Sequence, residues 1–386
     1  MKKIIIFLSF FFLFSKLVYA ENITKYSKSA ILIESSTGKV LYEVNADEKR
    51  SPASMTKIMS MILIMDAIHD NKITLDDKVL ISENASSMGG SQVYLNTGEE
   101  YKVSELLKSV AIASANDAVV ALSEKVSGSV DKFVSDMNQK CTLIGCTNTL
   151  FKNPHGLDAD GHYTTARDMS LMANYLIKNY PDILGYTSIY EDYLKRPDGS
   201  QTWLVNTNKL VRFYPDVDGL KTGFTDTAGY NLTSTAKKSN MRLIGVVMGV
   251  DSSDNRTSDT VKMLNYGFNN YKLSIIYEKD KIIDEVRIEK GKKEKVKLIL
   301  MNDATELTNI NDKEKEYTIN IRTNILVAPL KKGQKIGVAE IIDNDNNIVT
   351  NVDITINEDI EKANIWDYFK RNINIVMSGK NIIKSN

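Results

Sequence analysis

Apolar residues occupy every position from Ile58 to Met65 except Ser60. A segment that is apolar on all sides predicts a buried central helix, and Pro52 suits its first turn. Three more segments repeat their apolar residues at helical spacing and predict further helices: Val103–Lys125, Thr164–Lys178 and Thr257–Phe268. The chain is therefore predicted to contain a helical subdomain.

Short β-rich runs flank these helices. Ser29–Ile33 and Lys39–Val44 are joined by the turn Ser35-Ser36-Thr37-Gly38, and Tyr230–Ala236 is joined to Met241–Val250 by a polar turn. Both pairs predict β-hairpins, whose strands are antiparallel. The expected fold class is therefore α/β (α+β), with a mainly antiparallel sheet beside the helical subdomain.

The composition changes near Tyr277, after which short alternating strands are separated by charged turns. We expect strands at 285–289, 294–301, 317–321, 326–330, 335–342 and 347–356. They predict a small all-β domain with a spacing or docking role, because no cluster of reactive groups lies in it. The predicted boundaries are 21–276 for the first domain, 277–357 for the β-rich domain and 358–386 for a tail.

The tail places aromatic and aliphatic residues at helical spacing beside basic ones. The apolar positions are Trp366, Phe369, Ile373 and Val376/Met377. A basic amphipathic helix of this kind is typical of segments that lie in a membrane interface. The alternative is a terminal helix that docks on the β-rich domain.

The N-terminus has the pattern of an export signal. Lys2 and Lys3 precede the apolar stretch Ile4–Phe14, and Val18-Tyr19-Ala20 resembles a signal-peptidase site. The alternative is an uncleaved anchor, but this stretch is shorter than the ~20 residues that a bilayer requires. We therefore expect residues 1–20 to be removed and the mature protein to reach the outer face of the cytoplasmic membrane as a peripheral protein.

Composition excludes several classes of protein. Lys and Arg number 49 and Asp and Glu also 49, so the basic excess of a nucleic-acid binder is absent. The three histidines show no metal-ligand spacing, and no metal or cofactor is expected; His155 suits a structural role in a loop. For Cys141 and Cys146 we expect two separately buried thiols, with a local disulfide as the alternative.

Three short strings carry the candidate chemistry: Ser54-Met55-Thr56-Lys57, Ser114-Ala115-Asn116 and Lys221-Thr222-Gly223. In this order they are the parts of a serine acyl-transfer site. Each string alone is weak evidence, because the chain also contains S-x-x-K at Ser36 and Ser234, and S-x-N at Ser82 and Ser253. Context excludes these copies, since we expect them in turns, in a strand and before a helix.

The residue types fit nucleophilic catalysis. Ser54 becomes a nucleophile when a neutral amine removes its proton, and burial favours the neutral form of Lys57. Ser114 is expected to relay a proton to the leaving amine, and Asn116 to hold the lysine and the substrate amide. Lys221 is expected to supply positive charge.

The third string is also expected to bind the substrate. Thr222 offers a hydroxyl to a substrate carboxylate, and Gly223 leaves room for the substrate backbone. The backbone N–H groups of Ser54 and Phe224 are the expected oxyanion hole. Phe224 contributes only its backbone to this chemistry.

The strings and their surroundings, Ser51–Lys57, Ser114–Ala118 and Asp218–Asn231, resemble those of the low-molecular-mass penicillin-binding proteins. These are serine-type D-alanyl-D-alanine carboxypeptidases, and the similarity extends to the β-rich domain and the amphipathic tail. The resemblance implies the penicillin-binding and serine β-lactamase-like transpeptidase fold. It also implies an acyl-enzyme on Ser54 that releases the terminal D-alanine of peptidoglycan stem peptides, and acylation by β-lactams.

Two further points come with this resemblance. Arg256 matches an arginine before the family's closing helix and is expected to help bind the substrate carboxylate, with a structural ion pair as the alternative. A class A-like β-lactamase and a non-catalytic penicillin-binding wall protein are the alternative functions. The first requires a glutamate between the second and third strings, where the stretch from Asn153 to Asp168 offers only aspartates.

Overall fold

The computed structural model describes residues 23–313 and 315–377, so the predicted export signal and the end of the tail lie outside the described residues. The chain forms two compact units. Among the described residues, the first comprises 23–33, Lys39–Ala236 and Leu243–Tyr266, and the second comprises Glu34–Gly38, Lys237–Arg242, 267–313 and 315–377.

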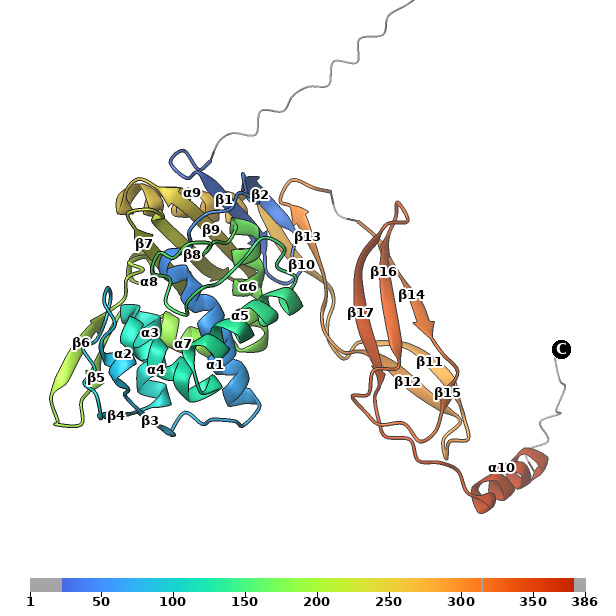
Figure 1. The fold of residues 1–386 in the computed structure, drawn as a ribbon. Helices are drawn as coiled ribbons and strands as arrows, with labels where there is room; N and C mark the ends of the chain where they lie inside the picture. The colour runs from blue at the N-terminus through green and yellow to red at the C-terminus, as the bar shows by residue number, and fades with distance from the viewer. Residues whose placement is uncertain (1–22, 314, 378–386) are drawn as a thin grey trace, which may run out of the picture. The chain divides into compact units, whose positions relative to one another are not determined.

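A five-stranded sheet forms one layer of the first unit, in the order β2-β1-β9-β8-β7 (Figure 1). Its strands are β1 (Ser29–Glu34), β2 (Val40–Val44), β7 (Val217–Thr225), β8 (Gly229–Lys238) and β9 (Met241–Val250). β1 pairs antiparallel with β2 and β7 with β8, and β8 and β9 are neighbours in the sheet that only Ser239 and Asn240 connect. The two predicted hairpins and the mainly antiparallel sheet are therefore confirmed.

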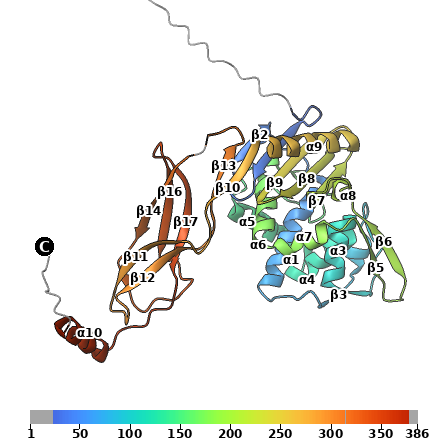
Figure 2. The ribbon, with the colours of Figure 1, turned by 180° about the vertical axis from the view of Figure 1, so that it is seen from behind.

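Helices form the rest of the unit around the central helix α1 (Lys57–His69), which is buried at every position from Lys57 to Met65. Helices α4, α5 and α6 pack against it (Figures 1 and 2). The helices are α2 (Glu83–Ser86), α3 (Val103–Ala113), α4 (Asn116–Ser127), α5 (Val130–Ile144), α6 (Ala166–Asn179), α7 (Leu184–Thr187), α8 (Leu210–Phe213) and α9 (Ser253–Asn270). Two short β-ribbons complete it, β3 (Lys78–Leu80) with β4 (Glu100–Lys102) and β5 (Glu191–Lys195) with β6 (Gln201–Val205).

The helical stretch predicted over Val103–Lys125, whose apolar set is interrupted by Ser114-Ala115-Asn116-Asp117, forms two helices. α3 ends at Ala113, and the capping residue Ser114 adopts the left-handed conformation with φ 61°. Residues other than glycine rarely adopt this backbone conformation, so contacts with neighbouring residues must stabilise the turn. The break also aims the start of α4, and with it Asn116, back toward α1.

The second unit has its own apolar core and a six-stranded sheet in the order β14-β16-β17-β12-β11-β15. Its strands are β11 (Ile282–Glu289), β12 (Lys295–Leu300), β14 (Tyr317–Thr323), β15 (Leu326–Val327), β16 (Gly337–Asp343) and β17 (Ile348–Ile356). The predicted C-terminal β domain is confirmed. A separate ribbon of β10 (Tyr271–Tyr277) and β13 (Ala304–Asn309) was not predicted, because even its nearest paired residues, Tyr277 and Ala304, are 27 positions apart and give no local turn signal.

Helix α10 (Ile365–Met377) ends the described chain. Arg371 fixes it to the second unit by donating to the backbone oxygen atoms of Gly291 and Lys292 and by pairing with Glu294 at 3.0 Å. Its large apolar side chains remain exposed, Trp366 by 70% and Phe369 by 55%. Among the described residues, no helix combines the length and apolar character needed to cross a bilayer.

The expectation of two separate thiols is wrong, because Cys141 and Cys146 form a disulfide. Gly145 ends α5 in the left-handed conformation, with φ 101°, and turns the chain sharply. The N–H of Cys146 then donates to the oxygen of Cys141, and the two Cα atoms lie 5.2 Å apart. This separation is within disulfide range.

Candidate active site

The first two members of the site lie where a short 3₁₀ turn, Ala53–Thr56, leads into α1. Ser54 lies on this turn, called the nucleophile turn below, and Lys57 is the first residue of the helix. Positions three apart on a helical turn face the same side. As a result, Lys57 Nζ lies 3.1 Å from Ser54 Oγ.

The surroundings of Lys57 favour a neutral amine with its lone pair toward the serine. The side chain is completely buried, and Nζ donates to Asn116 Oδ1 and to the backbone oxygen of His155, both at 2.6 Å. Burial, and secondly the charge of Lys221, hold its pKa well below the ordinary 10.5. A neutral amine has two N–H bonds, and both acceptors can only accept. The remaining lone pair therefore points to Ser54 Oγ, the position required of a general base.

The second string lies at the break between α3 and α4. The amide of Asn116 is oriented on both sides, since Oδ1 accepts from Lys57 and Nδ2 donates to the oxygen of Gly89 at 2.7 Å. Ser114 Oγ is buried and has no hydrogen-bond partner within residues 23–313 and 315–377. Buried hydroxyls usually have a partner, so this one is available to a substrate or a transferred proton.

The third string lies on β7, where Lys221 is 1% exposed and Arg256 of α9 is 7% exposed. Burial, and then the charge of Arg256, lowers the pKa of Lys221 to about 7. Burial lowers the pKa of Arg256 to about 10, and its Nε has no hydrogen-bond partner in the described chain. Two buried cations without a carboxylate partner favour an anionic ligand, since burying a charge is costly unless it is paired. The structural ion pair considered for Arg256 is not found in the described residues.

Gly223 has a packing role that sequence reasoning did not give it. A Cβ at this position would lie 2.5 Å from the oxygen of Pro52 and 3.1 Å from the backbone nitrogen of Met55. The glycine therefore allows β7 to pack against the nucleophile turn. Thr222 Oγ1 donates to Thr207 Oγ1 at 2.6 Å, and the ring of Phe224 is 48% exposed.

Thr56 and His162, which sequence reasoning did not single out, hold the nucleophile turn. His162 Nδ1 accepts from the backbone N–H of Lys152, so the neutral ring carries its proton on Nε2 and donates to Thr56 Oγ1 at 2.8 Å. Thr56 Oγ1 in turn donates to the oxygen of Ala53 at 2.8 Å. Burial lowers the pKa of His162 to about 4, which keeps the ring neutral near pH 7. No local pattern marks this pair, because 106 residues separate its members.

The loop between Asn153 and Asp158 closes the site from the other side. His155 contributes its backbone oxygen, while its ring accepts from the N–H of Leu157, in agreement with a structural role. At Gly156, with φ 87°, a Cβ would lie only 1.9 Å from the oxygen of Ala53. The loop therefore packs directly on the nucleophile turn.

The four competing copies of the strings lie elsewhere. Ser36 occupies a turn and donates to Glu34, and Ser234 lies in β8 and donates to the oxygen of Gly245. Ser82 caps α2 rather than forming the expected solvated turn. Ser253 begins α9, four residues before the expected start of that helix, and Ser252 provides its cap.

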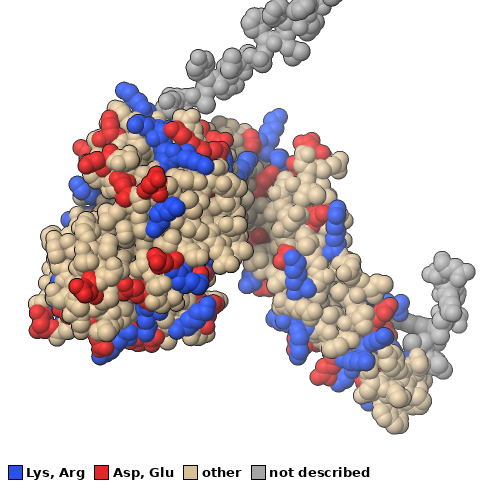
Figure 3. All heavy atoms as spheres, in the orientation of Figure 1, with Lys and Arg blue, Asp and Glu red and all other residues tan. Residues whose placement is uncertain are grey.

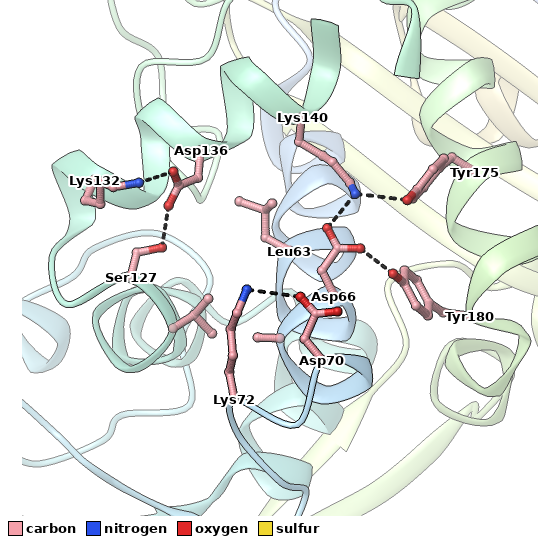
Figure 4. A pocket seen from close by; sticks show the side chains of 12 residues that line it. Leu63, Asp66, Asp70, Lys72, Ser127, Lys132, Asp136, Lys140, Tyr175 and Tyr180 are labelled. Carbon is pink, nitrogen blue, oxygen red and sulfur yellow. Dashed lines mark hydrogen bonds and ion pairs between the residues drawn. The ribbon is translucent and has the colours of Figure 1, made fainter. Parts of the chain in front are cut away.

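A cavity of about 490 Å³ lies at the opposite end of α1 from Lys57 (Figure 4). Its charged side chains pair with one another: Lys140 with Asp66 at 2.8 Å, Lys72 with Asp70 at 3.0 Å, and Lys132 with Asp136. Tyr175 also accepts from Lys140. Because these groups already satisfy one another, the candidate chemistry belongs to the other end of the helix.

Comparisons with known proteins agree with this geometry. The D-alanyl-D-alanine carboxypeptidase family matches residues 17–252, and the penicillin-binding protein 5 C-terminal domain matches residues 271–362. The chain is 46% identical over 349 residues to D-alanyl-D-alanine carboxypeptidase DacF of Bacillus subtilis, covering 89% of this chain and 88% of that protein.

Solved structures give the same result. Penicillin-binding protein 5 of Haemophilus influenzae matches with a TM-score of 0.72 and 32% identity, over 87% of this chain and 98% of that one. Penicillin-binding protein D2 of Listeria monocytogenes, in its ampicillin-bound form, matches with a TM-score of 0.57 and 30% identity, over 63% and 97%. The β-lactamase and non-catalytic alternatives are not favoured. The chain belongs to the D-alanyl-D-alanine carboxypeptidase family and is a serine-type carboxypeptidase.

Proposed function

We propose that Ser54 is the nucleophile of this carboxypeptidase and Lys57 its general base. The observation that carries the proposal is the Lys57 amine, which is buried, donates to two acceptors and directs its lone pair at Ser54 Oγ. No other S-x-x-K serine in the described chain has this arrangement.

The reaction proceeds in two steps. Ser54 Oγ attacks the carbonyl carbon of the penultimate D-alanine while its proton passes to Lys57 Nζ. The C–N bond then breaks, and the terminal D-alanine amine leaves with a proton delivered through Ser114. Water hydrolyses the resulting ester and regenerates Ser54. Asn116 holds both the lysine and the substrate amide, and the N–H groups of Ser54 and Phe224 stabilise the oxyanion.

Lys221, Thr222 and Arg256 are proposed to bind the terminal carboxylate of the stem peptide. The support is electrostatic, since the two cations are buried without an acidic partner in the described residues and a carboxylate would supply one. Because β7 packs against the nucleophile turn, a carboxylate bound there would place the D-alanyl-D-alanine end for attack. β-Lactams resemble that end, and the ampicillin-bound form of the Listeria protein supports the proposal that β-lactams bind this chain; we propose that they acylate Ser54.

The test uses purified protein without residues 1–20 and the peptide diacetyl-Lys-D-Ala-D-Ala. The wild type is expected to release D-alanine, and Ser54→Ala is expected to abolish release. Lys57→Met is expected to slow acylation by a fluorescent penicillin at least ~10²-fold, the lower end for loss of a general base. Labelling of Lys57→Met at the wild-type rate, or unchanged release by Ser54→Ala, contradicts these roles. Rapid hydrolysis of benzylpenicillin would instead support a β-lactamase.

We also propose that the exported protein associates with the outer face of the cytoplasmic membrane through the tail that begins at residue 358. The support is α10, whose visible surface in Figure 3 is largely uncharged and whose Trp366 and Phe369 are exposed. We likewise propose that the β-rich domain begins at residue 277 and the tail at residue 358. When the protein is mixed with anionic vesicles and centrifuged in a density gradient, wild type is expected to float with the vesicles. The double variant Trp366→Ser and Phe369→Ser is expected to remain at the bottom of the gradient. Leu143→Ser, which removes an exposed leucine of α5, is the matched control.

A further inference from the structure

The β5–β6 hairpin carries two exposed aromatic side chains on one face. Tyr193 and Trp203 pair across the strands and are 49% and 59% exposed. Directly paired residues lie on the same side of a hairpin with Cβ atoms about 5 Å apart. The hairpin projects from the helices of the first unit at the lower left of Figure 1 and the lower right of Figure 2.

The opposite face of the hairpin fixes it to the protein. Leu194 and Leu204 are completely buried and belong to the main core of the unit. Lys108 of α3 donates to the backbone oxygen of Tyr193 at 2.8 Å, and Arg196 donates to the oxygen of Val93 at 2.6 Å. The two aromatic rings are thus presented on a rigid base.

Hydrogen bonds connect the hairpin with the active site. Val93, held by Arg196, donates its N–H to Asp117, the residue after Asn116. At the other end of the hairpin, Thr207 accepts from Thr222. Trp203 and Thr207 are four positions apart in the chain, which is at most about 13 Å when extended. A five-residue stem peptide spans at most about 17 Å when extended, so its attached sugars can reach the hairpin while its end lies at Ser54.

We propose that the face formed by Tyr193 and Trp203 is a subsite for the glycan strand that carries the stem peptide. The inference rests on the proposed function of the site. Sugar rings offer C–H faces that pack on aromatic rings, and hydroxyl and amide groups at their edges. The exposed side chains of Glu191, Lys195 and Gln201 flank the rings on the same face and are able to hydrogen-bond these groups.

Other occupants fit this face less well. The flanking charges of Glu191 and Lys195 oppose insertion into a lipid surface. A stable protein partner typically buries about 800 Å² on each side, more than one face of two five-residue strands offers. A glycan needs only the two rings and their polar borders.

The first experiment uses Trp203 as a fluorescent probe. The chain contains two tryptophans, so Trp366→Phe leaves Trp203 alone. Titration with N-acetylglucosamine oligomers is expected to change its emission saturably, and Tyr193→Thr, which retains a strand-forming residue, is expected to weaken binding about tenfold. The matched control Leu143→Ala, which removes an exposed side chain of α5, is expected to bind normally. No change in emission, or saturable binding of stem peptides without glycan instead, overturns the proposal.

The second experiment compares two substrates. Trp203→Thr and Tyr193→Thr are expected to release D-alanine from diacetyl-Lys-D-Ala-D-Ala within twofold of wild type. Their release from polymeric peptidoglycan at subsaturating concentration is expected to fall about tenfold. Equal losses on both substrates, or none on the polymer, overturn the glycan subsite. Ser54→Ala is expected to retain the fluorescence response without turnover, so the two proposals fail separately.

Discussion

Replacing Lys221 by Met is expected to stabilise the fold while impairing the enzyme. The ammonium group of Lys221 is buried beside another cation, and its pKa falls from 10.5 to about 7. A difference of this size costs the folded state up to about 5 kcal/mol below pH 7, where the folded and the unfolded chain both hold the proton and the folded chain must bury the charge. Met has similar length, fills the same space and carries no charge, so it removes this cost.

This cost makes the free energy of unfolding depend on pH in a direction that can be measured. Between about pH 7 and 10.5 the unfolded chain binds a proton at residue 221 that the folded chain lacks. The free energy of unfolding of wild type therefore rises with pH across this range, by up to about 1.4 kcal/mol per pH unit from this group. The variant lacks this contribution, so its advantage is expected to be largest near pH 6 and to shrink toward pH 10.

The assay is urea unfolding at pH 6 and pH 9.5, followed by the emission of Trp203 in the Trp366→Phe background, which reports on the first unit. Acylation by a fluorescent penicillin is measured in parallel and is expected to fall ~10- to 100-fold, since a hydrogen bond to a charged group is lost. Identical pH dependence of the two proteins, or a less stable variant at pH 6, would refute the reasoning that Lys221 is an unpaired buried cation.

Three further predictions concern contacts within the first unit. The amide of Gln in His162→Gln keeps a donor that reaches Thr56, so the acylation rate of this variant is expected to stay within ~3-fold of wild type. The shorter amide in His162→Asn does not reach Thr56, so the acylation rate is expected to fall ~10-fold or more, as it does when a catalytic group is slightly misplaced. Equal rates of labelling by fluorescent penicillin in the two variants contradict this. Replacing Cys141 and Cys146 by Ala is expected to cost about 2 kcal/mol of unfolding free energy, the entropy of a loop with a sequence separation of 5; unchanged urea midpoints contradict it. Gly156→Ala places a methyl group 1.9 Å from a backbone oxygen, so its thermal midpoint and acylation rate are both expected to fall; wild-type values for both contradict it.

The sequence by itself determined the elements whose signals are local. The apolar run of α1, the hairpins of the sheet and the strands of the second unit follow from periodicity and turn residues within a few positions. The candidates Ser54 and Lys57 also follow locally, because three positions on one helical turn bring both side chains to the same face.

Only the tertiary structure decided what surrounds these residues. The amine of Lys57 is oriented by Asn116 and His155, which lie 59 and 98 residues away, and the nucleophile turn is held by His162. The glycine of the third string proved to be a packing contact, and the β10–β13 ribbon pairs distant strands. Such contacts depend on how separate elements pack, and neither periodicity nor spacing along the chain records that packing.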